Sequence, residues 1–85
     1  MLSLKIDEAM KKFYMEFPTS KILSVVDYDK WFIFNYIPVD AKIGESYIIT
    51  LIGIEKATGN IIGFNPLDHD PDKYFKTVEE NILIF

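Results

Sequence analysis

Apolar side chains recur at helical spacing near the start of the chain, and charged side chains fill the positions between them. The apolar positions with this spacing are Ile6, Met10, Phe13 and Phe17. Pro18 follows, and the residue before a proline is disfavoured in the α region. The pattern therefore predicts a helix from Ser3 to about Phe17, with Ser3 as the candidate N-cap.

Four β-prone runs follow and form two pairs. Lys21 to Asp27 and Trp31 to Ile37 are separated by the turn Asp27-Tyr28-Asp29-Lys30. The second pair lies within Tyr47 to Phe64, on either side of the turn Lys56-Ala57-Thr58-Gly59. A short loop with a glycine that can take a positive φ is typical of a hairpin. The sequence thus predicts two hairpins in succession.

The strand before the second turn is apolar on both of its faces. A sheet with one solvated face shows a cleaner alternation of apolar and polar positions. Either a helix covers each face, or a helix covers one face and a second chain covers the other. Gly53 and Gly63 interrupt these strands, and glycine there often marks a bulge or a close approach, such as a helix lying on the sheet.

A second helix is predicted from Pro71 to about Asn81, because Asp70 is a good N-cap and proline is favoured at the first helical position. The apolar run from Ile82 to Phe85 either forms a short edge strand or continues this helix. We therefore predict a single α+β domain over residues 1–85: an N-terminal helix, a four-stranded antiparallel sheet of two hairpins, and a C-terminal helix.

Composition narrows the function classes. The net charge is −4, the chain has no Cys, and all nine basic residues are Lys. An acidic domain without Arg is a poor match for a polyanion, which argues against nucleic-acid binding. No apolar run approaches the ~20 residues that span a bilayer, and acids stand early in the chain where a signal peptide would be apolar. We expect a cytoplasmic protein that does not enter a membrane.

Candidate catalytic chemistry is sparse. The single His, His69, lies among Asp68, Asp70 and Asp72, and His with carboxylates can bind a divalent metal or act as a base. Adjacent loop residues rarely converge on one ion, and no second His or Cys completes a tetrahedral site. No phosphate-binding glycine pattern or nucleophile elbow is present. The sequence therefore predicts no metal, no cofactor and no enzyme activity.

Aromatic and acidic residues near the first turn suggest a binding patch instead, because Trp and Tyr are enriched at protein interfaces. The loop from Pro38 to Glu45 breaks the periodicity and could also contact a partner. The candidate binding residues are Asp27, Tyr28, Asp29, Trp31, Asp40 and Glu45. In the alternative interpretation, Trp31 belongs to the core, and the negative charge only keeps the domain soluble.

The run from Ile52 to Phe64 resembles the hairpin of bacterial small immunity domains, the immunity protein 35 and YrhB-type domains. The order of a first helix, a strand containing Trp31, this hairpin and a proline-containing stretch before a final helix is similar as well. Glu55 stands where that family has Asp, and the loop from Pro38 to Glu45 lacks a glycine-rich entry. The resemblance implies a protein that binds and neutralises a toxin domain and has no catalytic residues.

Two functions from different classes follow. The first is a domain that binds another protein, such as a basic toxin domain. The second is a homo-oligomer, for instance a homodimer, that binds a small ligand in an apolar aromatic pocket. The second predicts a closed cavity lined by Phe13, Phe32 or Phe34.

Overall fold

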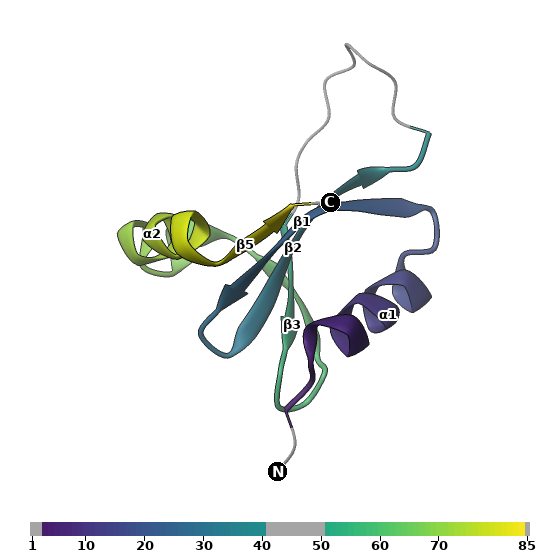
Figure 1. The fold of residues 1–85 in the computed structure, drawn as a ribbon, viewed down its shortest axis with the longest axis horizontal. Coiled ribbons are helices and arrows are strands. Elements are labelled where there is room, and N and C mark those ends of the chain that lie inside the picture. The colour runs from purple at the N-terminus through teal and green to yellow at the C-terminus, as the bar shows by residue number, and fades with distance from the viewer. Residues whose placement is uncertain (1–2, 41–50, 85) are drawn as a thin grey trace.

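The computed structural model describes residues 3–40 and 51–84. The chain forms an N-terminal helix, an antiparallel sheet and a C-terminal helix, which confirms the predicted α+β class (Figure 1). The elements are α1 (Ile6–Glu16), β1 (Ser20–Tyr28), β2 (Trp31–Pro38), β3 (Leu51–Glu55), β4 (Ile61–Phe64), the 3₁₀ helix η1 (Pro66–Asp68), α2 (Pro71–Asn81) and β5 (Ile82–Ile84).

The sheet has the strand order β4-β3-β2-β1-β5, and every neighbouring pair is antiparallel. Strands β1 to β4 follow one another as a meander, whereas β5 returns from the end of α2 to lie beside β1. Within the described residues the sheet has five strands, not the predicted four. The additional strand is the apolar run after Asn81, in which Ile82 pairs with Val26 and Leu83 pairs with Val25.

Helix α1 begins three residues later than predicted. Lys5, not Ser3, occupies the N-cap position, and its backbone N–H donates to a Glu8 carboxylate oxygen at 3.2 Å. Glu8 therefore satisfies a backbone donor of the first turn that the Ser3 side chain was expected to satisfy. The helix ends before Pro18, as predicted, and the N–H of Phe17 closes it on the carbonyl of Phe13.

Helix α2 begins and ends as predicted. A carboxylate oxygen of Asp70 accepts from the N–H of Lys73 at 3.1 Å, and Pro71 takes the first helical position. Ile82 already has extended backbone angles, so the chain passes directly from helix into strand. Of the helices in residues 3–40 and 51–84, none has the length and apolar character needed to cross a membrane.

The sheet carries a separate apolar core on each face, and each core is covered by one helix (Figure 1). On the α1 face the core consists of Ala9, Phe13, Ile22, Val25, Phe32, Phe34, Ile52 and Ile54. On the α2 face it consists of Val26, Tyr28, Ile33, Phe64 and Tyr74. Of the two arrangements that the sequence allowed for a sheet with two apolar faces, the structure has the one with a helix on each.

The sheet is irregular in β1 and not at Gly53 or Gly63, the two strand glycines where the sequence indicated a bulge or a close approach. The register shift, a β-bulge, lies in β1 between Ile22 and Ser24. A Cβ at Gly53 would meet side chains of Ile62 and Ile33 on the two flanking strands at 3.2 and 3.3 Å, so neighbouring strands, not a helix, crowd this position. A Cβ at Gly63 would meet nothing within 4 Å.

Candidate functional site

The two acidic residues of the β1–β2 turn are both held by lysines from elsewhere in the chain. Lys56 Nζ forms an ion pair with the Asp27 carboxylate and donates to the backbone carbonyl of Asp29 at 2.9 Å. Lys73 Nζ lies 4.0 Å from a carboxylate oxygen of Asp29. These contacts connect the turn to the β3–β4 hairpin and to α2. A cationic group of a partner would therefore have to compete with Lys56 and Lys73 for these carboxylates.

The two aromatic residues predicted near this turn are not equally accessible. Tyr28 is only 3% exposed and belongs to the α2-face core, so it cannot contact a partner directly. Trp31 is half-buried, and its ring stacks near that of Tyr28 with centroids 6.5 Å apart. Lys30 Nζ lies 5.0 Å from the centre of the Trp31 ring. Trp31 thus contacts the core and is also partly exposed. This position is intermediate between the two interpretations from sequence, a residue of a binding patch and a residue of the core.

The remaining predicted binding residues do not join this turn. Asp40 is exposed at the end of the first described range. Glu45 lies outside the described residues. The structure therefore does not gather the predicted residues into one patch. Asp27 is paired with Phe32 on the α1 face of the sheet, whereas Trp31 is paired with the buried Tyr28 on the α2 face.

His69 lies among aromatic rings. Its imidazole stacks on Phe64 with ring centroids 4.5 Å apart and meets the edge of Trp31 at 5.3 Å. Its neighbour Asp70 is occupied as the N-cap of α2. In residues 3–40 and 51–84, no three His, Cys, Asp or Glu side chains gather closely enough to hold a metal ion.

Among the titratable groups of the described residues, Tyr74 has a clearly shifted pKa. Its side chain belongs to the α2-face core. Burial raises the pKa of the Tyr74 hydroxyl above its ordinary value of 10.0, and the nearby Tyr28 raises this pKa further because the two phenolates would repel each other. The rings of these two tyrosines meet edge to face at 5.5 Å. The aromatic cluster is therefore an environment for neutral groups.

The residues expected to line a closed aromatic cavity are mostly packed against one another. The rings of Phe13 and Phe34 stack at 5.1 Å, and neither side chain is exposed. Phe32 also belongs to this core, although part of it borders a hollow that is open to solvent.

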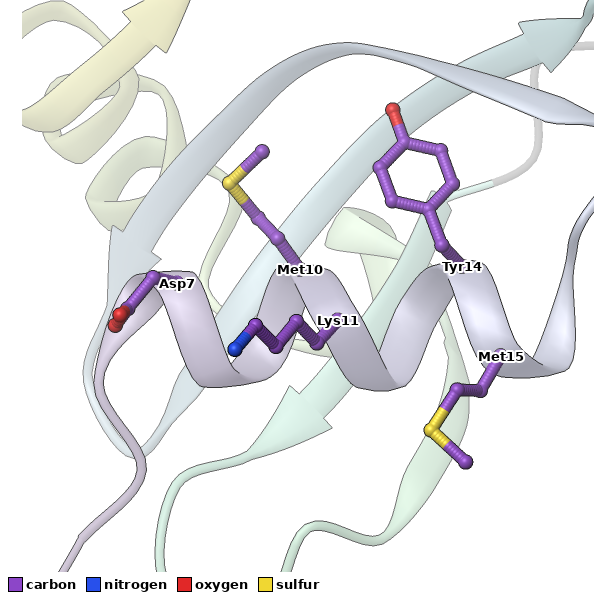
Figure 2. Close-up of a pocket in the computed structure, with 5 residues that line it drawn as sticks. All are labelled: Asp7, Met10, Lys11, Tyr14 and Met15. Carbon is purple, nitrogen blue, oxygen red and sulfur yellow. The ribbon is translucent and has the colours of Figure 1, made fainter.

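A first open hollow lies beside α1 and has a volume of about 580 Å³ (Figure 2). Its apolar walls are the side chains of Met10, Tyr14 and Met15, and Asp7 and Lys11 supply its charged groups. Met10 and Tyr14 point from α1 toward the sheet in Figure 2, whereas Met15 points away from them. The Tyr14 hydroxyl also accepts from the N–H of Ile22, at 3.4 Å, beside the bulge in β1.

A second open hollow, of about 560 Å³, lies between the start of α1 and strand β5. Its lining residues are Lys5, Ile6, Val25, Asp27, Phe32, Glu80, Asn81, Ile82 and Leu83. Because Ile6, Met10 and Tyr14 are spaced four residues apart, they lie on one side of α1. Met10 and Tyr14 border the first hollow and Ile6 borders the second, so both hollows adjoin this side of α1, and we call them together the α1–β5 groove.

The sequence reasoning did not identify this groove. The helical spacing places Met10 on the core face of the predicted helix, and it predicts no role for Met15. Met15 is 81% exposed. The available signal was a large apolar side chain on the otherwise charged side of an amphipathic helix.

No family model, curated protein or solved structure matches this chain. The resemblance to small immunity domains stays a prediction.

Proposed function

We propose that this chain is a protein-binding domain without catalytic activity and that the α1–β5 groove receives its partner. The observation that carries the proposal is the open, apolar wall of Met10, Tyr14 and Met15 beside α1. Exposed apolar surface of this kind marks interaction sites. Methionine suits such a surface, because its flexible, polarizable side chain adapts to different shapes.

The partner that fits the chain is a basic protein with an apolar anchor. The net charge of −4 attracts a basic partner over a distance and raises the rate of encounter. The apolar groove would then provide most of the affinity, because buried apolar anchors dominate interface energies. A basic toxin domain, as the resemblance to immunity proteins implies, has this chemistry, and the domain would neutralise it by covering its surface.

A small-ligand site is the second candidate function, and one observation favours it. Phe32 borders the hollow of about 560 Å³. Ligand sites usually enclose most of their ligand. Because this hollow is open and Phe13 and Phe34 are packed against each other, the geometry supports a protein partner better.

The test is to co-express the chain with the product of the adjacent reading frame and to measure growth and, for the purified pair, binding by calorimetry. The variant Met15→Glu places a charge at the rim of the first hollow, which Met15 lines although its side chain points away from Met10 and Tyr14. Leu67→Glu is the matched control, because Leu67 is 77% exposed, similar to Met15 at 81%, but lies on η1. We expect Met15→Glu to weaken binding at least about tenfold, the effect of ~1.4 kcal/mol, and Leu67→Glu to leave it unchanged.

Equal binding by both variants and the unmodified chain would exclude the groove as the binding surface. If the neighbouring product neither binds nor inhibits growth, the proposed toxin partner is wrong. A measured hydrolytic or transfer activity of the purified chain would contradict the non-catalytic assignment.

A further inference from the structure

Among residues 3–40 and 51–84, strand β5 forms an edge of the sheet that no further strand covers. One side of this strand pairs with β1, and the opposite side has no neighbouring strand within the described residues. Proteins usually protect such an edge with a lysine, a proline or a bulge. The three residues of β5 are Ile82, Leu83 and Ile84, which include none of these devices. Leu83 is 49% exposed and Ile84 is 78% exposed.

The sequence of β5 matches itself when it is reversed. If two copies lie antiparallel about a two-fold axis at Leu83, Leu83 faces the partner's Leu83, and Ile82 faces the partner's Ile84. Every directly opposed pair is then apolar, and such pairs stabilise a sheet. No like charges oppose each other in the strand, although each copy carries a net charge of −4. A basic peptide would find no acid within this strand.

We propose that two copies of this chain pair through β5, antiparallel about a two-fold axis at Leu83, and join their sheets into one. Successive residues of a strand direct their N–H and C=O groups to opposite sides. At least one residue of β5 therefore presents both groups at the outer edge, where the second copy can bond them. An interface of this kind uses the same patch on both copies and closes at two.

The pairing would also extend the apolar surface beside α1. Leu83 lies opposite Val25, which belongs to the α1-face core, so Leu83 is on that face of the sheet. A two-fold axis perpendicular to the sheet keeps both α1 helices on the same face. The α1–β5 grooves of the two copies then meet at Leu83 and the partner's Leu83. The dimer does not depend on the proposed function, because it involves no other protein.

The interface is small. Three paired residues bury much less than the roughly 1,200–2,000 Å² of a stable protein interface. The dimer should therefore depend on concentration, with a dissociation constant of roughly 10 µM to 1 mM.

Sedimentation equilibrium from about 10 µM to 1 mM tests the dimer over the expected range of affinity. We expect the mass of the unmodified chain to rise from 9.9 kDa toward twice that value. Ile84→Lys places a charge on the edge, and we expect at least about tenfold weaker association. Leu67→Lys is the control, because Leu67 is 77% exposed, similar to Ile84 at 78%, but lies on η1 outside β5, and this variant should behave as the unmodified chain.

Single cysteines test the register, since the chain has no Cys of its own. In the proposed pairing, two residues at position 83 are directly opposite, about 4.5–5.5 Å apart at Cα, which is within disulfide reach. Two residues at position 84 would be about 8 Å apart, which is too far. We expect Leu83→Cys to form a disulfide-linked dimer under mild oxidation much faster than Ile84→Cys.

Three outcomes would overturn the proposal. The unmodified chain could remain at 9.9 kDa throughout the concentration range. Ile84→Lys, shown to be folded by circular dichroism, could dimerise as tightly as the unmodified chain. Ile84→Cys could cross-link as fast as Leu83→Cys, which would exclude the two-fold axis at Leu83.

Discussion

Replacing Gly59 with Ala should destabilise the fold, although the substitution adds a single methyl group. Gly59 closes the β3–β4 turn with φ at +77°, and its N–H donates to the carbonyl of Glu55 at 2.7 Å. An L-residue in the left-handed region costs about 1–2 kcal/mol. A Cβ here would also lie 2.6 Å from Lys12 Nζ, but this is the end of a flexible side chain and can move aside. We therefore expect a loss of about 1–2 kcal/mol in the free energy of unfolding.

The same substitution at Gly63 is the matched control. Gly63 lies four residues further along, in β4, its φ is not positive, and a Cβ would meet nothing within 4 Å. Alanine at a compatible site reduces the freedom of the unfolded chain and stabilises by about 0.4–1 kcal/mol. The two variants should therefore shift stability in opposite directions. A domain of this length has only roughly 4–13 kcal/mol of stability in total, so the difference is readily measured.

Urea unfolding followed by the fluorescence of the single Trp provides the measurement. With a slope of about 1–2 kcal/mol per molar urea, Gly59→Ala should lower the midpoint by about 1 M. Gly59→Asn separates the two causes, because Asn tolerates the left-handed region better than Ala but has a larger side chain. We expect Asn to cost less than Ala. A greater loss with Asn would assign the effect to crowding against Lys12, and an unchanged midpoint in Gly59→Ala would refute the backbone argument.

Two further predictions concern the two cores. Phe13→Ala should lower the free energy of unfolding by about 3–5 kcal/mol, because Phe13 has no exposed surface and stacks on Phe34. Met15→Ala, on the same helix but exposed, should change it by less than about 0.5 kcal/mol. Urea unfolding of both variants measures the difference. The pKa of Tyr74 is raised in the folded state, so the unfolded state loses this proton first as the pH rises. The neutral Tyr74 therefore contributes its full stabilisation below pH 10, and the free energy of unfolding should decrease as the pH rises above 10. Urea midpoints between pH 9 and pH 11.5 should fall more steeply for the unmodified chain than for Tyr74→Phe, and equal slopes would contradict the assignment.

Local patterns were sufficient to predict most of the elements. Helix α1 follows from the spacing of its apolar residues, and a proline marks the end of one helix and the start of the other. Gly59 marks the turn between β3 and β4. Each of these signals involves only residues a few positions apart in the chain. The predicted start of α1 was wrong, because the Glu8 side chain accepts a hydrogen bond from the backbone N–H of Lys5. This hydrogen bond takes the place of the expected serine cap. Strand β5 could not be distinguished from a continued helix, because Ile-Leu-Ile suits both until β1 offers an edge to pair with.

The candidate site was harder to predict, because accessibility depends on which helix covers which face. Tyr28 and Trp31 are close in sequence and both aromatic, but the packing of Tyr74 against Tyr28 buries the first and leaves the second half-exposed. The ion pair of Asp27 with Lys56 joins residues far apart in the chain, and no local pattern indicates it. Met15 can be recognised as part of the first hollow only when the structure shows that Met10 and Tyr14 line the same hollow.

The strand order has a consequence during synthesis on the ribosome. Strands β1 to β4 can pair as soon as each emerges, since each joins the strand made just before it. The outer edge of β1, at Ser24–Val26, must wait until Ile82–Ile84 have been made. During that interval the nascent chain exposes a β-prone apolar edge that can pair with other chains. Loss of the last strand, by early termination or proteolysis, would therefore favour aggregation more than its three residues suggest.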